Sequence, residues 1–132
     1  MKVYIATKFE NKELFLQASK ELNEICHEVA YDWTTHKPIK PYVENSDIAS
    51  VYSNNELEGI KNCDVFIYVT SEKGHTLHME FGAALILSKT IGKPKLIYAV
   101  GEFNDQSPWF FNPLVRRKDT IQEVFEELRN EK

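Results

Sequence analysis

One short apolar segment and the helix predicted after it constrain this chain more than any other feature. Residues 64–69 are β-branched and aromatic and are apolar on both faces, which is typical of a strand in the middle of a parallel sheet. Residues 77–91 then carry apolar side chains almost all round a helix, which predicts packing against that sheet. Parallel strands need helical crossovers, so the pair predicts an α/β protein.

The remaining elements follow from the same spacing rules. We expect strands at residues 3–6, 28–32, 95–100 and 114–117, and helices at residues 12–26, 48–62 and 120–130. The helix at 48–62 is expected to be capped by Ser46 or Asp47 and to bury Val51, Leu57 and Ile60. This order predicts a flavodoxin-like or Rossmann-like three-layer α/β/α sandwich with a four- to five-stranded parallel sheet.

Composition narrows the class of protein. The 132 residues are expected to form a single domain, residues 1–132. A formal net charge of −4 without a basic run argues against a nucleic-acid polymer as partner. The apolar runs are too short for a signal peptide or a membrane span, and Cys26 and Cys63 are isolated thiols. These features predict a cytoplasmic protein without disulfides.

Glu80 is the residue on which we expect the chemistry to depend. Helical spacing puts it on one face with Ala84 and Leu87, so its carboxylate is directed toward the buried side, which is costly unless it has partners or a role. A first-turn position favours the ionised form through the helix dipole, and burial opposes it. Such a carboxylate is suited to attack or stabilise a developing cation; alternatively, the dipole alone explains a glutamate there. Residues 82–84 are small, which we expect lets the helix lie close to the sheet.

Ligands of such sheets bind beyond the carboxyl ends of the strands. The loops expected at this edge are residues 7–11, 33–45, 70–76 and 101–112. They and the start of the following helix supply the candidate substrate-binding residues, which are Thr7, Lys8, Phe9, Trp33, Ser71, Gly74, His75, Thr76 and His78. The spacing of His75 and His78 permits a metal, but no further ligand cluster accompanies them, so no metal is expected.

Aromatic residues are frequent in two of these loops. Trp33 lies in the first, and Trp109, Phe110 and Phe111 lie in the second. Such side chains either stack on a base or form a subunit contact. The sequence leaves both open, and we expect a mixture.

Three motifs resemble those of the nucleoside 2-deoxyribosyltransferase family and its relatives, the 2'-deoxynucleoside 5'-phosphate N-hydrolases. They are the opening strand with Tyr4, the run 55–65 (Asn-Glu-Leu-Glu-Gly-Ile-Lys-Asn-Cys-Asp-Val), and residues 74–84 with Glu80. Two departures accompany the resemblance. The first loop is Thr7-Lys8-Phe9 where the family usually carries glycine, and Gly74 stands where the transferases have aspartate and the phosphohydrolases serine.

The resemblance implies an enzyme that cleaves or exchanges the N-glycosidic bond of a nucleoside or nucleotide. Glu80 matches the glutamate nucleophile, Glu56 matches an aspartate that binds the sugar or assists the base, and Tyr4 matches a tyrosine beside the nucleophile. A carboxylate is suited to an oxocarbenium-like transition state, and a second acid to protonating the departing base. The resemblance further implies a small-molecule substrate, no cofactor and a homodimer.

Two other functions are compatible with the same residues. A non-catalytic nucleotide-binding or sensing module on this scaffold would bind the ligand without turnover, and a structural oligomerising domain would do neither. For Glu56 the plain alternative is a solvated helix position, and for Tyr4 it is packing in the core.

Overall fold

Five parallel strands form one sheet in the order β2-β1-β3-β4-β5. This computed structural model describes residues 1–131, and Lys132, the last residue of the predicted domain, lies outside the described residues. The strands are β1 (Lys2–Ala6), β2 (Glu28–Val29), β3 (Val65–Val69), β4 (Leu96–Val100) and β5 (Val115–Lys118). The predicted parallel sheet is confirmed, and β3 is its central strand, paired with β1 and β4.

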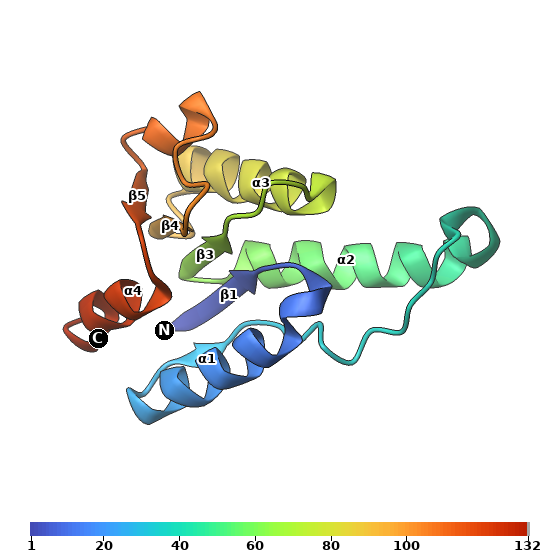
Figure 1. Cartoon of the computed structure of the whole chain (residues 1–132), viewed down its shortest axis with the longest axis horizontal. Helices are drawn as coiled ribbons and strands as arrows, with labels where there is room; N and C mark the ends of the chain where they lie inside the picture. The colour runs from blue at the N-terminus through green and yellow to red at the C-terminus, as the bar shows by residue number, and fades with distance from the viewer. Residues whose placement is uncertain (132) are drawn as a thin grey trace.

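Helices cover both faces of the sheet, as a three-layer sandwich requires (Figure 1). The helices are α1 (Lys12–Glu24), α2 (Ser46–Asn62), α3 (His75–Ile91) and α4 (Ile121–Arg129), with short 3-10 turns η1 (Phe9–Asn11), η2 (Tyr42–Asn45) and η3 (Pro108–Phe111). Buried residues of α1 and α4 form one core with Val3, Ile5 and Ile67. Buried residues of α2 and α3 form the other with Tyr4 and Phe66. Strand side chains alternate between the two cores because successive residues point to opposite faces.

Helix α2 departs from its prediction in two ways. Val51 and Leu57 are more than half exposed, and only Ile60 of the three expected inward residues is buried. The reason is visible in Figure 1, where the amino-terminal part of α2 extends beyond the sheet together with η2. The predicted cap is also wrong: Ser46 is already helical, and Asn45 in the capping position donates instead to the carbonyl oxygens of Ile39 and Pro41.

Other boundaries differ by a few residues. The edge strand β2 has two residues where five were expected. Helix α3 ends at Gly92 as predicted, with a left-handed φ of 74° that glycine adopts readily, but it begins at His75, two residues early. Among the helices of residues 1–131, none has the length and apolar character needed to cross a membrane.

Candidate active site

Glu80 lies where β1 and β3 end and α3 begins, and it is partly buried. Tyr4, in β1, donates a hydrogen bond from its hydroxyl to Glu80 Oε1 at 3.0 Å. The Tyr4 side chain is only 1% exposed, and its ring stacks on Phe66 with the centroids 5.4 Å apart. A buried strand residue therefore holds the carboxylate in place.

The position of Glu80 in its helix corrects one expectation. Because α3 begins at His75, Glu80 is the sixth residue of the helix and lies outside its first turn. The unpaired N–H groups of a helix start act within that first turn, so the helix dipole does not account for a charged Glu80. The hydrogen bond from Tyr4 takes that role.

Glu56 brings a second carboxylate to Glu80 from α2. Burial raises the pKa of Glu80 to about 8, the charge of Glu56 and hydrogen bonding with it add to the rise, and the Tyr4 hydrogen bond opposes it. The pKa of Tyr4 is itself raised, first by burial and then by the Glu80 charge, so its hydroxyl stays protonated and donates. Two like charges this close do not both ionise easily. The pair therefore holds one proton near neutral pH.

Gly59 explains how α2 comes this close to β1. A methyl group at Gly59 would lie 2.8 Å from the Cβ of Tyr31 and 3.1 Å from Cε2 of Tyr4. Since Gly59 is less than one helical turn from Glu56, the missing side chain lets α2 approach until the two glutamates meet. The expectation for residues 82–84 is different in outcome: Ala84 is fully buried, but a methyl group at Gly82 would make only an ordinary 3.7 Å contact with Trp109.

A histidine that the motif analysis did not single out touches this pair. His36 lies in the loop between β2 and α2, with Nδ1 3.7 Å from Glu56 Oε1. Its ring stacks on Tyr52 with the centroids 3.7 Å apart, and Tyr31 bonds its Nε2. The only signal in the sequence was the length of the loop at 33–45, because His36 and the tyrosines are adjacent only in the fold.

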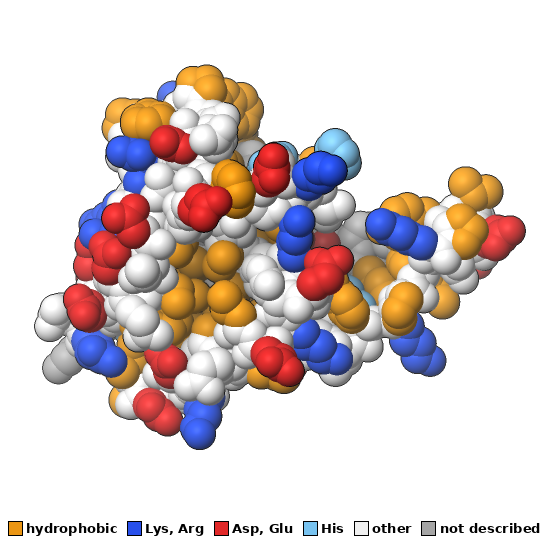
Figure 2. All heavy atoms as spheres, in the orientation of Figure 1, with side chains coloured by type: hydrophobic (Ala, Val, Ile, Leu, Met, Phe, Trp, Pro, Cys, Tyr) orange, Lys and Arg blue, Asp and Glu red, His pale blue; other side chains and the backbone are white. Residues whose placement is uncertain are grey.

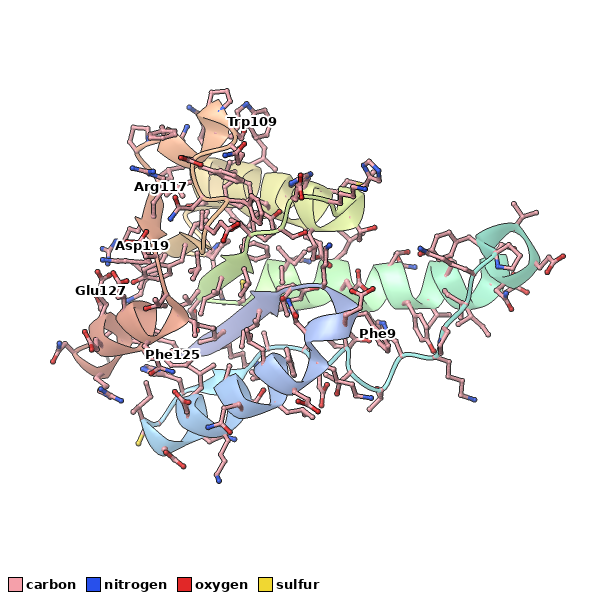
Figure 3. All side chains as sticks on the ribbon, in the orientation of Figure 1. Phe9, Trp109, Arg117, Asp119, Phe125 and Glu127 are labelled. Carbon is pink, nitrogen blue, oxygen red and sulfur yellow. The ribbon has the colours of Figure 1, made fainter. Side chains whose placement is uncertain are left out.

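The first loop lies beside the end of β1. Thr7 is buried and accepts a hydrogen bond from Asn11 Nδ2, and Lys8 is partly exposed. Phe9 is 45% exposed and lies on η1, beyond the tip of the β1 arrow (Figure 3). These three residues reach the carboxyl edge of the sheet, as predicted.

The loop after β3 also lies at this edge. Gly74 precedes α3 with a φ of 147°, a conformation that side chains rarely adopt. Ser71 closes the loop by bonding to the backbone of Lys73. His75, Thr76 and His78 are exposed, and His78 meets the ring of Tyr68 edge-on. Among residues 1–131, no group of three possible ligands is arranged to hold a metal ion.

The aromatic loop residues separate into core and surface. Trp33 is 7% exposed, packs against Phe15 and donates from its indole to the Ile5 carbonyl, so the structure places it in the core. Phe110 is also buried, against Phe81. Trp109 and Phe111 are exposed on η3, where Figure 3 shows Trp109 beside α3 and away from Phe9. The structure therefore does not bring the four aromatic side chains together.

Tyr68 is a second residue that the sequence did not mark. It is fully buried near the carboxyl end of β3, and its hydroxyl has no hydrogen-bond partner among the described residues. Its pKa is raised, first by burial and then by the charge of Glu80. Its proximity to Glu80 adds a hydroxyl donor to the surroundings of the site.

Comparison with solved structures identifies the fold. The CMP N-glycosidase BcmB of Clostridium botulinum matches with a TM-score of 0.63 at 19% identity, over 97% of each chain. A 2-deoxyribosyltransferase of Bacillus psychrosaccharolyticus matches with a TM-score of 0.66 at 17% identity, over 100% of this chain and 93% of that one. The chain has the nucleoside 2-deoxyribosyltransferase-like fold.

At the level of sequence this fold is not recognised by the other comparisons. No family model matches the chain. No curated protein matches it either. The resemblance drawn from three short motifs is thus confirmed through the architecture, which is shared with an N-glycosidase and a deoxyribosyltransferase.

The close approach at Gly59 predicts that Gly59→Ala lowers the free energy of unfolding by about 1–3 kcal/mol, because the added methyl group overlaps Tyr31 and Tyr4. Denaturant unfolding measures the change. Gly82→Ala is the matched control in α3: it has room and gains helix propensity, so it should be neutral or stabilising by up to about 1 kcal/mol. Equal effects of the two substitutions would contradict this account.

The raised pKa of Glu80 predicts a pH-dependent gain in stability for Glu80→Gln. Below the ordinary value of 4.5 the carboxyl group is protonated in both states; as pH rises toward about 8 only the unfolded chain loses its proton, so folding becomes less favourable. The variant should match the unmodified protein at pH 4 and be more stable at pH 8 by about 2 kcal/mol. Thermal unfolding across this range tests it, with the exposed Glu72→Gln as control; a constant difference would refute it.

Proposed function

We propose that this protein cleaves or exchanges the N-glycosidic bond of a nucleoside or nucleotide, with Glu80 as the nucleophile. The observation that carries the proposal is the hydrogen bond from buried Tyr4 to Glu80 at the carboxyl edge of the sheet, with Glu56 beside it. The shared fold supports it, because the two matching structures are named for N-glycosidase and deoxyribosyltransferase activities.

The first step forms a glycosyl ester on Glu80. The Glu80 carboxylate attacks C1' of the sugar as the bond from C1' to the base nitrogen breaks, and the bonding electrons leave with the base. Glu56 gives its proton to the departing nitrogen and becomes a carboxylate. One proton on the pair is the amount this step needs, and the Tyr4 hydrogen bond favours the charge on Glu80.

The second step releases the sugar. Water, or a second base, attacks C1', the ester bond to Glu80 breaks, and Glu56 accepts the proton that the incoming group loses. The pair then returns to its starting state. Lys8, Ser71, His75 and Thr76 surround this edge, and we assign them to the sugar hydroxyls or to a phosphate.

Turnover tests the proposal directly. The purified protein should release or exchange base on a panel of deoxynucleosides, ribonucleosides and their monophosphates, and Glu80→Gln should lower kcat by at least about a thousandfold. Glu72→Gln is the control that should leave it unchanged. Binding of a panel member without any turnover would instead support the sensing module.

The role of Glu56 has its own test. Glu56→Gln should lower kcat about a hundredfold on natural substrates, because the departing base receives no proton. On a 4-nitrophenyl glycoside, whose leaving group needs no proton, the loss should be much smaller. Equal losses on both kinds of substrate would remove Glu56 from the role of acid.

We further propose that the protein is a homodimer joined through the projecting part of α2. Figure 2 shows hydrophobic side chains gathered on that projection, at the right of the view. The exposed apolar residues of η2 and α2 are Tyr42, Val43, Ile48, Val51 and Leu57. Single isolated apolar residues are common on surfaces, but a cluster favours a contact. A second copy there would lie beside Glu56, which belongs to the same helix.

Sedimentation equilibrium tests the dimer. The unmodified protein should sediment as a dimer, and Val51→Glu should shift it to a monomer because a charge would be buried at the contact. Ile86→Glu changes an equally exposed apolar residue on α3 and is the control. A monomer at every concentration would exclude the proposal.

A further inference from the structure

His36 is the best-held polar side chain beside the two glutamates. Its side chain is 12% exposed, and its ring lies parallel to that of Tyr52 with the centroids 3.7 Å apart. The Tyr31 hydroxyl lies 2.5 Å from Nε2, and Nδ1 lies 3.7 Å from Glu56 Oε1. Contacts from β2's exit loop and from α2 thus fix both edges of the ring.

These contacts determine which nitrogen carries the proton. Burial raises the pKa of Tyr31, so its hydroxyl keeps its proton and donates to Nε2. A neutral imidazole with Nε2 as acceptor carries its hydrogen on Nδ1, the atom that faces Glu56. Burial lowers the pKa of His36, with Glu56 and Asp32 opposing the change, which keeps the ring neutral at pH 7.

We propose that His36 is a positioning residue for Glu56, whose imidazole, held between Tyr31 and Tyr52, directs an N–H group at the Glu56 carboxylate and stabilises it when it loses its proton. The inference rests on the proposed role of Glu56 as acid. In the first step Glu56 becomes an anion next to Glu80, and a fixed donor at that place favours the anion as it forms. In the second step the same donor holds the carboxylate in position to accept a proton.

The pH dependence of kcat tests the donor. His36→Phe keeps the ring stacked on Tyr52 but removes both nitrogens, so the Glu56 anion loses its donor and Glu56 retains its proton to higher pH. The basic limb of the profile should move up by about one pH unit, with kcat reduced about tenfold. His36→Asn restores an N–H group near the position of Nδ1 and should return the limb toward that of the unmodified protein. A lowered kcat with an unmoved limb would show a merely structural role and overturn the inference.

A second measurement needs no turnover. NMR titration of the His36 ring should give a lower pKa in Glu56→Gln than in the unmodified protein, because the neighbouring anion that raises it is gone. Glu58→Gln makes the same charge change at an exposed position of α2 and should leave the His36 pKa unchanged. If the two variants behave alike, His36 and Glu56 are not coupled and the inference fails. Since this readout is independent of substrate, its failure is distinct from an absence of base release.

Discussion

Two carboxylates held together at a partly buried place are the constraint on which the rest of this structure depends. Burial and mutual repulsion both oppose their ionisation, so the fold has to supply donors. Tyr4 donates to Glu80 from the sheet, and His36 faces Glu56 from a loop. The result is a pair that keeps one proton and one charge, which suits a reaction that needs an acid and a nucleophile together.

The scaffold is arranged to bring this pair together. The parallel sheet places Tyr4 and the start of α3 at one edge, because strands β1 and β3 run in the same direction. Gly59 lets α2 approach Tyr4 and Tyr31 more closely than any side chain would allow. The projecting part of α2 then carries apolar residues away from the sheet. One helix therefore serves the core, the site and the proposed subunit contact with three successive segments.

Much of the site was predictable because its residues lie in short patterns with local meaning. Glu80 stood out as a carboxylate on an apolar helix face, and the strand position of Tyr4 made a contact with it reasonable. Trp33 illustrates the opposite case: an aromatic residue in a loop was expected at the ligand, yet its indole closes the core under α1. His36 and Tyr68 could not be found, since nothing near them in the sequence reports which side chains they meet.

By itself the sequence determined the class of fold, the order of the elements and the candidate nucleophile, because strand and helix periodicity record which side of each segment is buried. Only the tertiary structure decided that α2 leaves the sheet after burying Ile60, that Glu80 is held by Tyr4 in place of a helix dipole, and that His36 lies beside Glu56. These are contacts between residues far apart in the chain, and periodicity carries no information about such distances.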